Sequence, residues 1–234
     1  WLQQGSATHT DRAIDLVSDA ASNIYVCGQF SDTITFDLPH ENIMTNASFL
    51  VKFDASGTEQ WFRRFGGAAF NHVRDMQLAS SGELLLCGDL QGSMTFFDTS
   101  PNNNTSPDAF PYYLMRVDLA GAEVAHSTEG SDNNVSAGAI DQTGATVAVL
   151  GTFDCQFTGL SDFYGGTGLF MATGPEDLFI TRHAFPSFTL NDAQQFGGQH
   201  HKYSGGIATS TGGALVFGGS YTKLLIFPSD RQLW

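Results

Sequence analysis

Three histidines are the side chains in this sequence best suited to binding a metal ion. His200 and His201 are adjacent, and His183 lies upstream of them. Imidazole is a common zinc ligand, but neighbouring residues on a strand point to opposite faces, so an adjacent pair is a poor chelate. We therefore interpret these histidines as parts of a polar loop and predict no metal site from them.

Two aspartates offer a second kind of chemistry. Asp15 and Asp75 fall at the same position of an internal repeat, on segments expected to form inner strands. Carboxylates that line a central channel can bind a cation. The third copy has Ala139 or Ile140 near this position, so the acids cannot form a full ring. The sequence thus favours neither a metal site nor a bound cofactor.

Motifs for catalysis are absent from the sequence. It contains no Gly-x-Ser-x-Gly elbow, no His-Glu-x-x-His motif and no phosphate-binding loop. An acid pair for glycoside hydrolysis cannot be selected by sequence alone from 24 Asp and Glu residues. We therefore predict a protein that is not an enzyme and has no catalytic residues.

The elements that must position these side chains form a repeat. Residues 1–28 align with residues 61–88 at a constant offset of 60 residues, without a gap. In this alignment Trp1 matches Trp61, and Cys27 matches Cys87. A repeat of this length with strand-like segments predicts the blades of a β-propeller.

One apolar strand occurs four times, at residues 23–30, 83–90, 145–153 and 214–221, and a weaker, inner strand precedes each copy. Each copy carries a late glycine, which predicts a β-bulge or a close backbone approach. These glycines are Gly28, Gly88, Gly151 and Gly218. A phenylalanine follows each copy and is expected to pack between blades, namely Phe36, Phe96, Phe157 and Phe227.

A third strand is predicted at residues 48–57 and 112–121, with Lys52 and Arg116 on a solvent-exposed face. A fourth strand carries Trp61. The predicted fold is all-β, a propeller of about four four-stranded blades that is either closed or part of a larger propeller. It is one domain, 1–234, with approximate blades at 6–67, 68–130, 131–198 and 199–234. Residues 1–5 are expected to be an outer strand of the preceding or closing blade.

Composition excludes several classes of partner. The net charge of −14, with only 10 Lys and Arg residues, disfavours nucleic acid and anionic lipid. No apolar run reaches the length of about 18 residues that a transmembrane helix needs. Cys27 and Cys87 are expected to be buried apolar residues, too far apart for a disulfide, and Cys155 a free thiol.

Several segments resemble a known repeat. The motifs WFRRFGG, NIYVCGQF, TITFD and FLVKFDASGTEQW are similar to the repeats of the bacterial secreted β-propeller family called SBBP repeats. The third copy departs from the pattern, since TGPEDL stands where the family has an Asp-x-x-Gly turn. The resemblance implies a propeller and export to the cell surface or medium, and it does not specify a ligand.

Together these observations predict a secreted or cell-surface, non-enzymatic propeller that serves as a binding or structural module in adhesion or assembly. Its partner would be a protein or a glycan, bound through the loops at residues 98–111 and 185–201. Two alternatives remain, a carbohydrate-active propeller enzyme and a subunit of an extracellular filament or envelope complex.

Aromatic residues and sequons add two details. Phe110, Tyr112 and Tyr113 would contact such a partner, although Tyr112 and Tyr113 are better interpreted as the start of a packed strand. Asn-x-Ser/Thr sequons, which mark exposed loops in secreted eukaryotic proteins, begin at Asn46, Asn103, Asn104 and Asn134.

Overall fold

The computed structural model describes residues 4–5, 11–41, 46–67, 71–96, 100–103, 110–129, 134–154, 161–162, 169–170, 172, 175–197, 202–210 and 212–221. These residues form strands, turns and irregular segments. No helix that could cross a membrane is found among them. The strands are β1 (Arg12–Ser18), β2 (Ile24–Phe30), β3 (Thr33–Thr35), β4 (Pro39–Glu41), β5 (Asn46–Phe53), β6 (Glu59–Gly67), β7 (Asn71–Leu78), β8 (Leu84–Leu90), β9 (Ser93–Phe96), β10 (Ser100–Asn103), β11 (Tyr112–Val117), β12 (Glu123–Glu129), β13 (Val135–Thr143), β14 (Thr146–Asp154), β15 (Ser161–Asp162), β16 (Leu169–Phe170), β17 (Glu176–Ala184), β18 (Leu190–Phe196), β19 (Lys202–Thr209) and β20 (Leu215–Tyr221).

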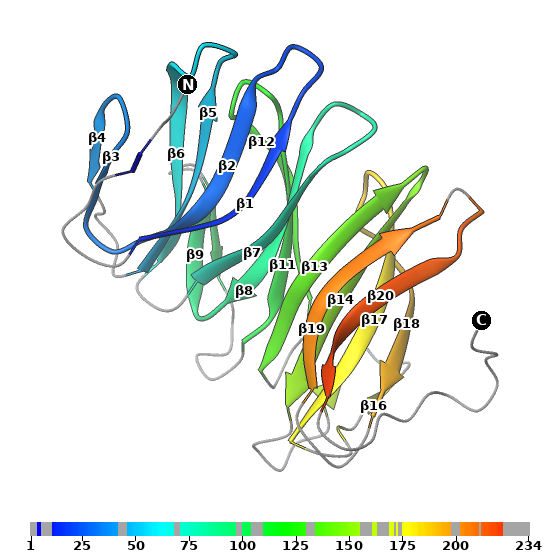
Figure 1. Ribbon diagram of the computed structural model, residues 1–234. Helices are drawn as coiled ribbons and strands as arrows, with labels where there is room; N and C mark the ends of the chain where they lie inside the picture. Colours follow the sequence, from blue (N-terminus) through cyan, green and yellow to red (C-terminus); the bar gives the residue numbers. More distant parts are fainter. Residues whose placement is uncertain are drawn as a thin grey trace.

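Three large antiparallel sheets and one hairpin contain most of these strands. Sheet I is ordered β1-β2-β5-β6 and continues into β9 and β10, sheet II is β7-β8-β11-β12, and sheet III is β13-β14-β17-β18. The hairpin β19–β20 follows sheet III. The first strands β1, β7, β13 and β19 lie side by side and run in the same direction (Figure 1). The all-β prediction is confirmed, with several open antiparallel sheets in the described part of the chain.

The central strands are apolar on both faces because each sheet is covered on both sides. On β8, Leu84 and Leu86 pack against sheet I, whereas Leu85 and Cys87 face sheet III. Successive strand residues point to opposite faces, so an uninterrupted apolar run indicates a strand in a middle layer. A third core, which includes Leu150, lies between sheet III and the β19–β20 hairpin.

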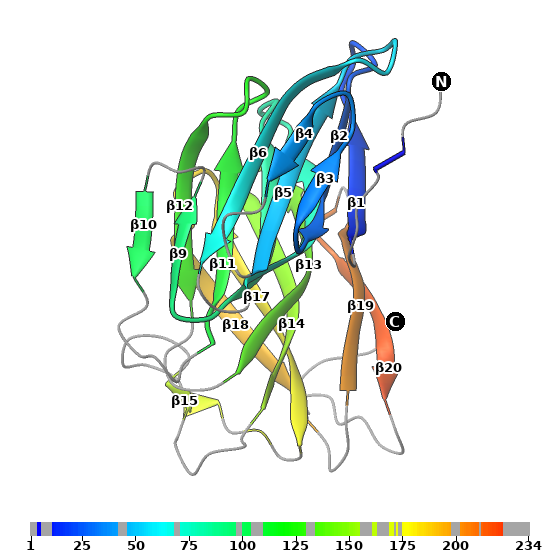
Figure 2. The ribbon, with the colours of Figure 1, turned by 90° about the vertical axis from the view of Figure 1, so that its left-hand side faces the viewer.

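The outer face of sheet I carries its own apolar cluster. Phe49, Val51 and Phe53 of β5 are buried there beneath Ile34 of the β3–β4 hairpin. Figure 2 shows this hairpin in front of β5 when sheet I faces the viewer. Phe36 packs on the same cluster, with its ring centroid 5.4 Å from that of Phe53. This hairpin therefore shields a face that no neighbouring sheet covers in the described part of the chain.

Sheet I is wider than the four strands predicted. The β9–β10 hairpin, which belongs to the second repeat, joins the edge of β6 where Gly66 pairs with Thr95. The sequence does not reveal this connection because the pairing joins two repeats rather than two strands of one. The extra strands tie the outer edge of sheet I to the chain of sheet II.

A β-bulge recurs in each innermost strand. The register shifts between Ala13 and Asp15 in β1, and at the matching places of β7, β13 and β19. The predicted glycines lie opposite the bulge in the first three copies, where an added Cβ would overlap a carbonyl oxygen of the inner strand. In the fourth copy this glycine is Gly219, and the prediction of Gly218 was wrong by one residue.

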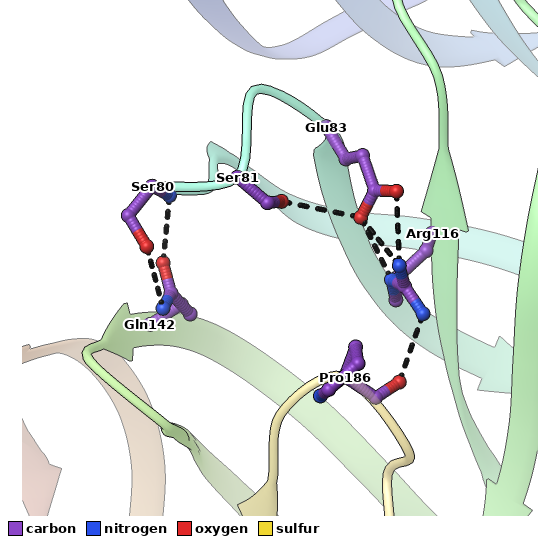
Figure 3. Close-up of polar contacts among 6 residues, drawn as sticks. All are labelled: Ser80, Ser81, Glu83, Arg116, Gln142 and Pro186. Carbon is purple, nitrogen blue, oxygen red and sulfur yellow. Dashed lines mark hydrogen bonds and ion pairs between the residues drawn. The ribbon is translucent and has the colours of Figure 1, made fainter.

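Polar side chains connect sheet II to sheet III (Figure 3). Arg116 of β11 donates two hydrogen bonds from Nη2 to Glu83, and its Nη1 donates to the Pro186 carbonyl at 2.9 Å. In the same interface, Ser80 N donates to Gln142 Oε1 at 2.9 Å.

The prediction that Lys52 and Arg116 lie on a solvent-exposed face was wrong. Only 13% of the Arg116 side chain is exposed, and Lys52 Nζ donates to the Leu119 carbonyl at 3.3 Å. The next sheet covers both positions, which the alternation of apolar residues along a single strand cannot show.

Candidate functional site

A cavity opens at the starts of the four innermost strands, where the bulges recur. Its volume is about 310 Å³. The bulges determine the shape of the cavity. The extra residue is Ile14 in β1 and Arg74 in β7, whereas it is a glycine in β13 and β19. Bulge side chains therefore occupy the side of the cavity at β1 and β7 and leave the side at β13 and β19 open. The described residues that line it are Arg12, Ile14, Arg74, Ser136, Gly138, Thr152, Tyr203 and Ser204.

The charged groups of this cavity are both positive. Arg12 and Arg74 are exposed, and Arg12 begins β1 whereas Arg74 is the bulge residue of β7. Arg74 Nε donates to Asp89 Oδ2 at 2.6 Å, so this guanidinium is held in place by an ion pair. Among the described residues, no hydrogen bond or ion pair of the Arg12 guanidinium is found.

Asp89 is the acidic partner of Arg74 beside this cavity. Its Oδ1 is buried and has no hydrogen-bond partner in the described part of the chain. His72 approaches the other oxygen, with Nδ1 4.0 Å from Oδ2. Burial lowers the pKa of His72, and the neighbouring Arg74 lowers it further while Asp89 opposes the change. The imidazole is therefore neutral near pH 7 and adds no positive charge.

A second cavity of about 300 Å³ adjoins the first one. Arg74 and Ser136 line both cavities, so the two adjoin where sheet II meets sheet III. The other described residues that line the second cavity are His72, Asp89, Phe110, Asn134 and Val135.

The Asp15 and Asp75 carboxyls lie further along the inner strands and close to each other, since both accept from Met76 N. Asp15 Oδ2 accepts from Met76 N at 3.2 Å, and Asp75 Oδ2 accepts from Ile140 N at 2.8 Å. Burial raises the pKa of Asp75 to about 7, and the Asp15 charge contributes to the increase. Asp75 therefore keeps its proton to near neutral pH.

These hydrogen bonds connect consecutive sheets rather than hold a cation. Each carboxylate accepts from the backbone of the next inner strand, and Asp141 continues the pattern by accepting from Thr209 N at 2.8 Å. Within the described ranges, no group of three or more His, Cys, Asp or Glu side chains is arranged to hold a metal ion. The oxygens that the sequence suggested for cation binding are occupied by N–H donors.

His183 belongs to the core between sheets II and III. It is fully buried, and its Nε2 lies 3.1 Å from the Tyr112 hydroxyl while Nδ1 lies 3.1 Å from the Phe188 carbonyl. Burial lowers its pKa to about 4, so the ring is neutral. His200 and His201 lie outside the described residues.

The aromatic pair on β11 is confirmed as the start of a packed strand. Tyr112 and Tyr113 are both fully buried, and Tyr112 stacks on Phe179 of sheet III. Phe110, two residues before Tyr112, is half-buried and lines the second cavity. Contact with a partner is therefore open to Phe110 but not to the two tyrosines.

The two predicted binding loops are described only in part. Residues 98–99 and 104–109 of the first loop and residues 198–201 of the second lie outside the described residues. The beginning of the second loop is a structural contact, because Phe185 lies over the Arg116 guanidinium at 5.2 Å.

The remaining candidates are quickly placed. Cys27 and Cys87 are buried free thiols, whereas Cys155 lies outside the described residues, as do Trp1, Phe157 and Phe227. Asn134 is half-buried and donates to Asp154 Oδ2 at 3.0 Å, so this sequon is not on a freely exposed loop. Asn46 begins β5, Asn103 ends β10, and Asn104 lies outside the described residues.

Sequence reasoning missed the cavity at the bulges. Its lining residues are separated by about one repeat each, and no motif connects Arg12 to Arg74 or to the serines. The available indication was the scarcity of basic residues, since two of only 10 lie on the first two inner strands. No protein-family model and no curated protein matches this chain.

Proposed function

We propose that this chain is a β-propeller, or part of one, that acts outside the cell as a non-enzymatic binding module. The observation that carries the proposal is the cavity at the starts of β1, β7, β13 and β19. A concave site at the ends of rigid strands, lined by polar groups, is typical of ligand binding in such scaffolds.

The propeller is supported by a position that repeats in every sheet. Tyr25, Leu85 and Ala148 face the next sheet and are at most 1% exposed, whereas the matching Val216 is 66% exposed. A valine in this place is suited to burial beneath another sheet of the same kind. The arrangement of sheets is thus one to which further blades can be added.

The non-enzymatic assignment is supported by the chemistry of one buried acid pair, Asp15 and Asp75. Glycosidases separate their two carboxyls by about 5–9.5 Å, to leave room for a nucleophilic attack or a water. Asp15 and Asp75 instead both accept from Met76 N, and Asp75 also accepts from Ile140 N. This pair serves the contact between sheets and is unsuited to general acid and base catalysis.

Location at the cell surface or in the medium rests on the resemblance to SBBP repeats. The acidic surface, with a net charge of −14, suits a soluble extracellular module. A test is to express the protein in cells that export it and to treat the intact cells with protease. The protease should remove the chain if it is exposed on the cell surface. Retention of the chain inside the cell would contradict this location.

The binding function is tested by filling the cavity. Ser136→Trp places a large side chain on the strand that lines both cavities, and Ser18→Trp places the same side chain at the far end of β1. On an array of defined glycans, the unmodified chain and Ser18→Trp should retain a ligand that Ser136→Trp does not. Release of altered glycans would instead indicate an enzyme, and equal retention by both variants would place binding elsewhere.

A second candidate function, a subunit of an extracellular assembly, is favoured by the same exposed face of the hairpin. Val216 is 66% exposed on the face of β20 that points away from sheet III, and another chain would cover it in an assembly. The molar mass measured by light scattering distinguishes the two cases. A concentration-dependent oligomer that Val216→Lys dissociates would support the assembly, and a constant monomer mass would support the module.

A further inference from the structure

We propose that the cavity at the bulges binds a small ligand that carries one carboxylate and several hydroxyl groups, such as an acidic sugar. The inference rests on the proposed binding function and specifies the chemical class of the ligand. It depends on the charge of the cavity, the state of its two arginines, its hydroxyl groups and its aromatic rim.

The charge of the cavity is opposite to that of the protein. The whole chain carries −14, yet both charged residues that line this cavity are arginines. Arginine presents a planar fork of donors that fits the two oxygens of a carboxylate. The acidic remainder of the surface repels extended polyanions, so a small anion is favoured over a nucleic acid.

The two arginines have different roles. Arg74 is neutralised by Asp89, to which its Nε donates at 2.6 Å, so it offers remaining N–H groups without net charge. Arg12 is exposed and has no such partner among the described residues. One uncompensated positive charge matches a carboxylate, which carries one negative charge, better than a phosphate monoester, which carries nearly two.

Hydroxyl groups surround these arginines. Ser136, Thr152 and Ser204 line the cavity from β13, β14 and β19, and no hydrogen bond from their hydroxyls to another described residue is found. Each hydroxyl can donate one hydrogen bond and accept two, which suits the alternating donors and acceptors of a sugar. The side chains therefore offer complementary partners for both parts of the ligand.

An aromatic ring completes the rim. Tyr203 lines the cavity and is 56% exposed. Its apolar face can pack against the C–H groups of a sugar ring while its hydroxyl remains in water. The volume of about 310 Å³ is at the lower end of the range for ligand pockets, which fits one sugar unit.

The experiment compares D-glucuronate with D-glucose, which has the same ring without the carboxylate. Binding of each sugar to the unmodified chain is measured through chemical-shift changes in ¹H–¹⁵N spectra at pH 7. We expect glucuronate to bind about tenfold more tightly than glucose, because a hydrogen bond to a charged group is stronger than a neutral one. Arg12→Gln should remove this difference, and Tyr203→Ala should weaken both sugars.

The matched control is Arg64→Gln, which removes the same charge from β6 at the other side of sheet I. It should leave glucuronate binding unchanged. Equal binding of the two sugars, or equal effects of Arg12→Gln and Arg64→Gln, would overturn the proposal. Tighter binding of D-glucose 6-phosphate than of glucuronate would overturn the choice of a carboxylate.

This result is separable from the proposed function. Retention of neutral glycans on the array, lost in Ser136→Trp, together with no preference for glucuronate, would refute the acidic ligand and leave the binding module intact. If the unmodified chain is folded and retains no glycan on the array, both the acidic ligand and the binding module are refuted.

Discussion

Replacing Asp75 with asparagine should stabilise the protein at alkaline pH and leave it nearly unchanged at acidic pH. The folded carboxyl has a pKa of about 7, whereas its ordinary value is 3.8. Unfolding between these two pH values releases a proton, so the free energy of unfolding falls as the pH rises through this window. The loss is complete above pH 7, where both states are ionised.

The magnitude follows from the pKa change. At 1.36 kcal/mol for each pH unit, the change from 3.8 to about 7 corresponds to about 4 kcal/mol. We expect a measured gain of about 2–4 kcal/mol at pH 8, because the carboxyl is incompletely buried and asparagine loses one hydrogen bond. The asparagine carbonyl can still accept from Ile140 N, whereas its amide replaces the oxygen that accepts from Met76 N.

Urea unfolding monitored by tryptophan fluorescence at intervals from pH 4.5 to 8.5 measures this difference. The control, Asp54→Asn, alters an exposed turn carboxylate whose pKa is lowered by hydrogen bonds from Ser56 and Thr58. Its effect should have the opposite sign, because that carboxylate contributes stability above its ordinary pKa and loses it as the pH falls. Parallel pH curves for Asp75→Asn and the unmodified chain would refute a raised pKa of Asp75.

Three further predictions concern the contacts between and within sheets. Gly88→Ala should destabilise the fold by about 3 kcal/mol or more because the added Cβ would overlap backbone, whereas Gly206→Ala, with open space around it, should change the melting temperature little. Arg116→Ala should lower the free energy of unfolding by about 1–3 kcal/mol, since it leaves a poorly exposed carboxylate unpaired. Arg182→Ala should have a smaller effect because its partner is 44% exposed, and equal effects would contradict this reasoning. His183→Gln should flatten the stability curve between pH 6.5 and 4, where the unfolded chain binds a proton that the buried ring does not; an unchanged slope in urea titrations would argue against a buried neutral ring.

The strands could be predicted from the sequence because their determinants are local. Apolar runs, turn residues and the late glycines identified β2, β8, β14 and β20 within a few residues of their bounds. The fourth glycine was placed at Gly218 instead of Gly219 because two glycines are adjacent there, and only the pairing with Tyr203 distinguishes them. Local patterns thus reveal strands but not the exact pairing of each residue.

The contacts between sheets could not be predicted in the same way. Arg116 alternates with apolar residues, as a solvent-exposed residue would, but the turn at Pro186 lies 70 residues away and covers it. The cavity has the same origin, since Arg12, Arg74 and Ser136 come together only when three repeats stack. The aspartates were recognised as special, and their actual partners, backbone N–H groups of another repeat, leave no trace in sequence.

The hydrogen bonds of the inner aspartates have a consequence for the order in which the chain folds. The three bonds that connect consecutive inner strands join residues 61, 65 and 68 positions apart, so each sheet depends on the one made just after it. Chains built from neighbour contacts of this kind can nucleate in one unit and propagate to the next. During synthesis, a completed sheet can therefore keep one apolar face uncovered until about one more repeat has emerged from the ribosome.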